Sequence, residues 1–286
     1  ITRYRKGDKM LFITGDLHFG HNVYGDQAVR KLAEYTCGKS TVADVLCLCG
    51  DIGSGEESLN EALELFRDFR GTKCAVLGNH DIWVFDESDS LAQFDRGHKI
   101  MKDQNFHPLD ESPLYLDDFA IVGSMGWYDY SFKDENLGIN RSFYADKIDP
   151  YTKQLIWNDA LYVKWNYSDT EAAEYFADKL DKHLAETRGR QVIAIMHHLP
   201  TKKLLFHPRW LVPKSYRFTN AFLGSEIYAG IFTNHEHLTN VFCGHAHMSR
   251  SASIKGQTFT CVGGNYSDKE LIEMNGKHIR RIAIKS

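Results

Sequence analysis

Short apolar segments recur along this chain, and each one ends in polar residues. Five of them have the length and β-prone composition of buried strands, and they occupy residues 10–14, 45–49, 74–77, 192–196 and 241–243. A glycine follows four of the five, where the backbone must bend sharply or approach another group closely. The pattern predicts five buried strands that each present polar side chains at the carboxyl end.

The residues that follow these strands are aspartate, asparagine and histidine. They form Gly-Asp-x-His, Gly-Asp, Gly-Asn-His-Asp, His-His and Gly-His-x-His, which begin at Gly15, Gly50, Gly78, His197 and Gly244. In open α/β sheets, binding sites form beyond the carboxyl ends of the strands. One Asp-x-His turn would be an ordinary polar turn, but five such strand ends in one chain predict a metal site.

Segments with helical spacing connect the early strands. Residues 23–35 and 57–69 carry apolar side chains at helical intervals, which indicates crossover helices between parallel strands. A further helix is expected over residues 169–187, where Ser168 or Asp169 can cap it. After the last motif, alternating segments separated by turn residues predict antiparallel strands at 251–254, 258–262, 271–274 and 278–284.

The middle of the chain is less regular. An acidic stretch over residues 86–95 indicates a solvated surface, and residues 117–123 restore a strand. The aromatic group at 127–132 either walls a pocket or packs onto the core; both interpretations stand for Trp127, and packing is favoured for the others. Residues 133–165 show few clear periods and indicate an insertion or lid.

The order of the metal-binding motifs resembles that of the calcineurin-like metallophosphoesterase superfamily, of the prokaryotic type. Every ligand-bearing motif of the superfamily is present between Asp16 and His247, which is most of the chain. The resemblance implies an α/β fold, a four-layer α/β sandwich in which two mixed β-sheets pack face to face with helices outside. It also implies a single domain over residues 1–286 with an insertion or lid within about 83–168.

The same resemblance assigns the metal ligands. It places Asp51 as the carboxylate that bridges two metal ions. One metal is then held with Asp16, His18 and His247, and the other with Asn79, His197 and His245. Register leaves open whether His197 or its neighbour His198 is the ligand, and His197 is favoured because it follows the strand directly.

Catalytic roles are implied for Asp51, as the bridging carboxylate, and for His80. In the family pattern His80 has no metal of its own, so it is expected to protonate the leaving oxygen or to hold a phosphate oxygen. Asp81 either orients His80 or points away from it, since adjacent side chains often diverge.

Substrate contacts are expected from Asn79, His80, His21 and His198. His21 and Asn22 extend the first motif, as in many prokaryotic members of the superfamily. Two interpretations of this pair stay open: the side chains contact phosphate, or they cap the helix that follows.

Such a centre would hydrolyse a phosphomonoester or a phosphodiester. The resemblance implies a dinuclear metal centre and a metal-bridging hydroxide that attacks phosphorus in line with the leaving oxygen. The predicted ligands are imidazoles, carboxylates and one amide, without sulfur, which suits two divalent or trivalent ions of Mn, Fe or Zn. The expected partner is a phosphorylated small-molecule substrate.

Two alternatives to this function stay open. A nuclease acting on nucleic acid would need a basic groove with aromatic side chains, and the formal net charge of -4 argues against one. The candidate groove is the segment 201–218, interpreted as an anion-steering rim or as a solvated loop, with cations at Lys202, Lys203, Arg209, Lys214 and Arg217. A non-catalytic metal-binding scaffold would lack a ligand, and none is missing.

Composition sets the class of protein. The chain is 43% hydrophobic and 25% charged, as in ordinary soluble proteins, and no apolar run is long enough to span a bilayer. Its six cysteines form no Cys-x-x-Cys motif and lie mostly in predicted strands, which indicates buried thiols in a reducing cytoplasm. Cys47 and Cys49 share a strand face, so a zinc site there is a disfavoured alternative. The sequence does not indicate an oligomeric state.

Overall fold

The computed structural model describes residues 9–286 except Glu87 and residues 206–211. Its first sheet has six strands in the order β12-β11-β1-β2-β3-β4. The strands β1 to β4 run parallel, and β11 and β12 add an antiparallel hairpin beside β1. Their bounds are β1 Leu11–Thr14, β2 Val45–Cys49, β3 Thr72–Val76, β4 His107–Pro108, β11 Lys269–Asn275 and β12 His278–Ile284.

The second sheet also has six strands, in the order β5-β6-β7-β8-β10-β9. Here β6, β7, β8 and β10 run parallel, with β5 and β9 antiparallel at the two edges. Their bounds are β5 Leu114–Tyr115, β6 Phe119–Ser124, β7 Gln191–Met196, β8 Leu238–Cys243, β9 Arg250–Ile254 and β10 Gln257–Cys261. The predicted C-terminal hairpins therefore exist, and each belongs to a different sheet: β9 and β10 to the second, β11 and β12 to the first.

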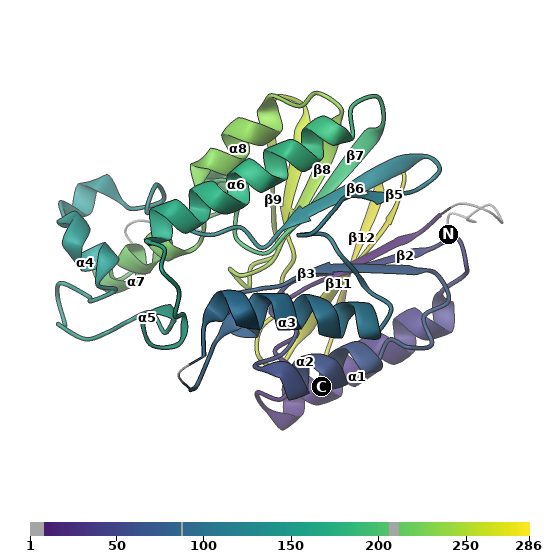
Figure 1. Ribbon diagram of the computed structural model, residues 1–286, viewed down its shortest axis with the longest axis horizontal. Helices are drawn as coiled ribbons and strands as arrows, with labels where there is room; N and C mark the ends of the chain where they lie inside the picture. The colour runs from purple at the N-terminus through teal and green to yellow at the C-terminus, as the bar shows by residue number, and fades with distance from the viewer. Residues whose placement is uncertain (1–8, 87, 206–211) are drawn as a thin grey trace.

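Helices cover the outer face of each sheet, as Figure 1 shows. The first sheet is covered by α1 Val23–Lys39, α2 Glu56–Glu64 and α3 Ser90–Asp103, and the second by α6 Asp169–Glu186 and α8 Glu226–Thr233. Alternate strand residues face opposite layers: Phe12 and Leu46 pack towards the helices, whereas Ile13, Cys47 and Ile195 pack between the sheets. This arrangement confirms the expected four-layer α/β sandwich.

The helices predicted at 23–35, 57–69 and 169–187 are present as α1, α2 and α6, although α2 already ends at Glu64. Ser168 caps α6 through a reciprocal pair of hydrogen bonds with Glu171, as the sequence indicated. The acidic side chains that the structure describes in residues 86–95, Asp86, Asp89 and Asp95, are exposed, as the solvated-surface interpretation expected, but a helix that the sequence did not predict also begins in this stretch. There the Asp89 side chain accepts hydrogen bonds from the backbone of Leu91 and Ala92, and so begins α3. The helix α8 was not predicted.

One end of the molecule carries the segment between β6 and α6 together with the neighbouring α7, as Figure 1 shows. It contains the short helices α4 Arg141–Ala145 and α5 Asp159–Tyr162, and α7 is Lys214–Thr219. Because α3, β4 and β6 belong to the layers, residues 125–168 are the part of the range 83–168 that lies outside the layers. The 3-10 helices are η1 His80–Ile82, η2 Glu135–Leu137, η3 Lys202–Leu204 and η4 Asn220–Phe222.

The cysteines form no disulfide. Cys47 and Cys74 lie opposite one another on β2 and β3, with their sulfur atoms 3.5 Å apart. Across the described residues, no group of three possible metal ligands includes a cysteine, which speaks against the zinc alternative. In the same part of the chain, no helix combines the length and the apolar content that crossing a membrane would require.

Candidate metal centre

The loops that leave β1, β2, β7 and β8 are bonded to one another at one edge of the sandwich. Within the first sheet, the backbone N–H of Asp16 donates to Gly50 O at 3.0 Å. Two further bonds join the sheets: His197 Nδ1 lies 2.9 Å from Cys49 O, and the His245 backbone N–H donates to Asp16 Oδ1 at 2.8 Å. Residues far apart in the sequence therefore converge on one point.

Several predicted ligands have left-handed backbone conformations, which are uncommon for residues other than glycine. Their φ angles lie between 45° and 68°, at Asp16, His18, Asp51, His245 and His247. Such conformations cost free energy and persist where the surrounding structure fixes them, as at binding sites. Each left-handed residue reverses the direction of the backbone just after a strand, which directs its side chain towards the other predicted ligands.

Two glycines give the ligands the space they need. A Cβ at Gly50, where φ is +81°, would lie 2.7 Å from Nδ1 of the His197 ring. A Cβ at Gly78 would overlap the carboxylate of Asp51. The glycines of the strand-end motifs are thus required by close approach.

The first cluster of ligands consists of Asp16, His18 and His247. His18 Nε2 lies 3.0 Å from His247 Nε2, and His247 Nε2 lies 4.0 Å from Asp16 Oδ1. Asp16 and His18 are buried, whereas the His247 side chain is 22% exposed. The nitrogen and oxygen atoms of the three residues thus point to one small volume.

The second cluster is centred on His197. Its Nε2 lies 3.0 Å from Asn79 Oδ1, 3.1 Å from His245 Nδ1 and 3.4 Å from Asp51 Oδ1. All four residues are buried. The structure therefore brings together the residues that the family pattern assigns to the second metal.

Asp51 lies between the two clusters. Its Oδ2 is 3.6 Å from His18 Nε2, while its Oδ1 is 3.4 Å from His197 Nε2. The two oxygens of one carboxylate thus face different imidazoles. This is the placement that a bridging carboxylate needs.

These distances fit metal coordination. Ligands bonded at about 2.1 Å to one ion lie about 3.0 Å apart at right angles and about 3.4 Å apart at the tetrahedral angle. In addition, Asp16 Oδ2 and His18 Nδ1 are buried without a hydrogen-bond partner, and unpaired buried polar atoms are costly.

The electrostatics favour a cation as well. Burial raises the pKa of Asp16, and burial with nearby carboxylates raises the pKa of Asp51 well above its usual value. Burial and neighbouring imidazoles hold the pKa values of His18, His197 and His245 well below theirs. A bound cation would stabilise the ionised carboxylates and use the lone pairs of the neutral imidazoles.

Comparison with known proteins agrees with this geometry. Residues 10–249 match the model of the calcineurin-like phosphoesterase family. The chain belongs to this family. It is a metallophosphoesterase, a hydrolase that acts on phosphoester bonds. A comparison with curated proteins finds no match.

Solved structures share the fold of this phosphoesterase. A phosphopantetheinyl hydrolase from Mycobacterium tuberculosis has a TM-score of 0.71 and 18% identity, with 96% of each chain covered. A dimetal phosphatase from Danio rerio has a TM-score of 0.56 and 11% identity, with 96% of this chain and 98% of that chain covered. At these identities the likeness shows the fold alone.

In the phosphoesterase, His80 lies at the edge of the two clusters. Its Nε2 is 4.0 Å from Asp51 Oδ2, and its ring stacks on Trp83 with the centroids 3.7 Å apart. Burial, together with His247 and His21, lowers the pKa of His80 to about 3. His80 also forms a third group of possible ligands, with His18 and Asp51.

Asp81 does not orient His80. Its carboxylate accepts hydrogen bonds from the backbone N–H groups of Ile52, Gly53 and Gly78, at 2.8 to 3.1 Å. These bonds tie the loop after β2 to the loop after β3. Asp81 therefore supports the backbone on which Asp51 and its neighbours lie.

The other predicted substrate contacts lie at different depths. His21 is exposed, with its ring 4.4 Å from the ring of Tyr266. Asn22 caps α1 by accepting from Gly25 N at 2.9 Å, so capping was the correct interpretation for this residue. His198 is buried behind His245, with its Nδ1 3.1 Å from Met125 O, and the structure does not bring it to the surface of the pocket.

The metal centre opens into a pocket of about 310 Å³. Asp51, Asn79 and His80 form part of its floor. Its wall includes aromatic residues that the sequence did not single out as site residues, which are Trp157, Tyr216 and Tyr266. Tyr266 lies over the floor, with its ring 4.5 Å from the ring of His18. No local pattern around Tyr266 signalled this position.

The segment 201–218 reaches the pocket through Tyr216, and Thr219 and Asn220 follow it there. Among the described residues, no lysine or arginine lines this pocket. Arg217 forms an ion pair with Asp134 at 2.6 Å. Further cations of the segment, Lys202 and Lys203, line an adjoining pocket, and His207 and Arg209 lie outside the described residues.

Proposed function

We propose that this phosphoesterase hydrolyses a phosphomonoester or phosphodiester at a centre that holds two transition-metal ions. The observation that carries the proposal is the placement of Asp51, whose two oxygens face two separate ligand clusters. Mn, Fe and Zn each suit a ligand set of imidazoles, carboxylates and an amide. When bound, two such ions supply Lewis acidity towards the phosphoryl oxygens and an activated water for in-line attack.

The side chains of the chain supply the remaining functions. Asp16, His18, Asp51 and His247 would hold one ion, and Asp51, Asn79, His197 and His245 the other. His80 lines the pocket, with its Nε2 4.0 Å from Asp51 Oδ2, so it is placed to hold a phosphate oxygen or to donate a proton to the leaving oxygen. With a pKa of about 3 the imidazole is neutral before a substrate binds, so proton donation would require that the anionic substrate raise this pKa when it binds. His21 lies at the rim, beside Tyr266.

The shape of the pocket favours a small phosphorylated substrate. A volume of about 310 Å³ accepts one compact group, and its aromatic wall offers apolar contact to the part of the substrate beyond the phosphate. The absence of lysine and arginine from the described lining does not favour nucleic acid. The name of the phosphopantetheinyl hydrolase suggests a phosphopantetheinyl ester as one substrate to assay.

The test is hydrolysis by protein that has been stripped with a chelator and then reloaded with Mn²⁺, Fe²⁺ or Zn²⁺. The substrates are nitrophenyl phosphate, bis-nitrophenyl phosphate, a phosphopantetheinyl ester and a single-stranded oligonucleotide. We expect no activity after stripping and recovery with at least one metal. Activity that survives stripping would contradict the proposal, and metal binding without hydrolysis of any substrate would identify a scaffold.

A further inference from the structure

One buried carboxylate of the insertion, that of Asp159, is hydrogen-bonded to a predicted metal ligand. Asp159 begins α5 and is 2% exposed. Its Oδ1 accepts from Asn79 Nδ2 at 2.9 Å and from Trp83 Nε1 at 2.8 Å. We propose that Asp159 is a positioning residue that fixes the side-chain amide of Asn79 so that its oxygen faces the metal. This inference rests on the proposed metal centre.

The bonds of Asp159 determine which way the Asn79 amide points. Indole N–H groups can only donate, and Asp159 receives two of them, from Trp83 and from Trp157 at 2.7 Å, so its oxygens act as acceptors. Asn79 must therefore turn its NH₂ group to Asp159. This leaves Asn79 Oδ1 3.0 Å from His197 Nε2, inside the second cluster. The flipped amide would place its oxygen against the carboxylate and its NH₂ group against the metal.

The same carboxylate supports two other parts of the pocket. Trp83, held through its indole N–H, stacks on the His80 ring at an interplanar angle of 27°. Trp157, held by the other oxygen, lines the pocket. One residue of the insertion thus positions a metal ligand, the stacking partner of His80 and a wall of the substrate site.

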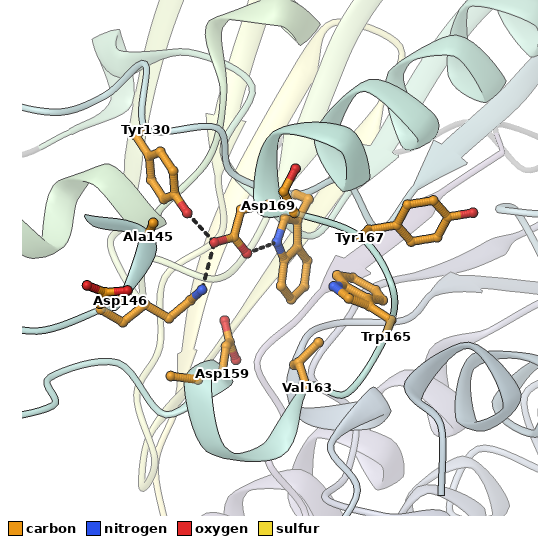
Figure 2. Close-up of a pocket in the computed structure, with 12 residues that line it drawn as sticks. Tyr130, Ala145, Asp146, Asp159, Val163, Trp165, Tyr167 and Asp169 are labelled. Carbon is orange, nitrogen blue, oxygen red and sulfur yellow. Dashed lines mark hydrogen bonds and ion pairs between the residues drawn. The ribbon is translucent and has the colours of Figure 1, made fainter. Parts of the chain in front are cut away.

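A neighbouring carboxylate provides a matched control. Asp159 and Asp169 both line a second pocket of about 410 Å³, which Figure 2 shows. Asp169 is also buried and accepts hydrogen bonds from Trp127 Nε1 at 2.8 Å, Lys147 Nζ at 2.6 Å and the Tyr130 hydroxyl. None of these partners is a predicted metal ligand. Replacement of Asp169 therefore removes a similar buried carboxylate without disturbing Asn79.

The experiment compares Mn²⁺ binding by metal-stripped wild type, Asp159→Asn and Asp169→Asn, by isothermal titration calorimetry. Removal of a residue that supports a metal ligand typically weakens binding about 10- to 100-fold. For Asp159→Asn we expect Mn²⁺ binding to weaken by this factor at one of the two metal sites. We expect kcat/KM for nitrophenyl esters to fall in parallel. For Asp169→Asn we expect wild-type Mn²⁺ affinity and only a lower melting temperature. Equal Mn²⁺ affinities for the two variants would overturn the inference.

A second pair of variants tests orientation directly, because both members carry the same replacement of Asn79. Asn79→Asp alone sets two carboxylates against each other. Asn79→Asp with Asp159→Asn restores one donor and one acceptor between the two side chains with their roles exchanged, with loss of the acceptor that Asp159 Oδ1 offers to Trp83 Nε1. We expect the double variant to bind Mn²⁺ at least about tenfold more tightly than Asn79→Asp. Equal affinities would overturn the inference. The titration is repeated with Fe²⁺ and Zn²⁺ if the wild type binds no Mn²⁺; if it bound none of the three, the proposed centre itself would fail, and the inference with it.

Discussion

The floor and the wall of the pocket are built in different ways. The floor consists of loops directly after strands, where each ligand lies within five residues of a strand end. The wall consists of side chains whose partners are remote: Asp159 bonds to a residue 80 positions away, and the backbone of Tyr266 accepts from Asn22, 244 positions away. The comparison teaches that the candidate metal ligands of this phosphoesterase are encoded locally, whereas the side chains that contact them and line the pocket are brought there by tertiary contacts.

The largest effect should come from the centre of the floor. Replacement of Asp51 by Asn removes a charge that faces both clusters, so we expect metal content to fall at both positions and kcat/KM to fall by about 10³-fold or more. Elemental analysis and steady-state kinetics measure the two quantities, with Asp169→Asn, which replaces a buried carboxylate of the second pocket, as the control. Two retained metals with near-native turnover would refute the bridging role of Asp51.

His80 stands where floor meets wall, and its replacement separates chemistry from metal binding. We expect His80→Gln to keep wild-type metal content while kcat falls by about 10²- to 10⁴-fold, the usual contribution of a general acid. The loss should be smaller for nitrophenyl esters than for alkyl esters, because nitrophenolate leaves without a proton. Equal losses for both classes would favour positioning of the phosphate instead.

Two glycines with similar backbones test how far the floor depends on close approach. Gly50 and Gly189 have φ angles of +81° and +89°, so an alanine at either position costs about 1–2 kcal/mol of strain. At Gly50 the new methyl group would meet the His197 ring, whereas a Cβ at Gly189 would have no heavy atom beyond its chain neighbours within 4 Å. We expect Gly50→Ala to lower kcat/KM by about 10²-fold and Gly189→Ala to leave it unchanged. Similar values of kcat/KM for the two variants would show that the site tolerates displacement of the His197 ring.

The pH dependence of metal binding should report the carboxylates of the floor. Burial raises the pKa values of Asp16 and Asp51 and lowers those of the buried histidine ligands. A metal that binds the ionised carboxylates competes with protons for them. Its affinity should therefore fall as pH falls through the range where these carboxylates take up protons, by about tenfold per pH unit for each proton displaced, and the raised pKa values move this range above that of an ordinary aspartate. Calorimetry in buffers of different ionisation enthalpy counts these protons. An affinity that stays constant from pH 8 down to the lowest pH at which the protein remains folded would contradict this account.

The smallest effect on catalysis is expected from the two lysines of the pocket that adjoins the substrate pocket. Lys202 and Lys203 line an adjoining pocket, so Lys202→Gln with Lys203→Gln should act only through long-range attraction of the anionic substrate. We expect KM to rise by about twofold at low salt with kcat unchanged. The effect should vanish at high salt, since screening acts over ~8 Å at physiological ionic strength. Kinetics at two salt concentrations check this, and no change at low salt would mean that the segment has no steering role.

The sequence predicted the residues of the pocket floor but not those of its wall. The strands at 45–49 and 278–284 were predicted to the residue, because alternation and turn signals are local. The convergence of Asp16, Asp51, Asn79 and His197 followed from strand ends that meet at one edge. Asp159 and Tyr266 could not be predicted, because their positions depend on contacts across the tertiary structure. The helix α3 was missed because its capping residue, Asp89, lies among other acidic residues.

The central claim is that Asp51 lies between two metal ions. The most direct test is anomalous diffraction at the manganese edge from a crystal of the wild-type protein grown with Mn²⁺. The account predicts two peaks about 3.5–4 Å apart, one beside Asp16, His18 and His247 and the other beside Asn79, His197 and His245, with the Asp51 carboxylate between them. A single peak, or peaks that do not share Asp51, would contradict it.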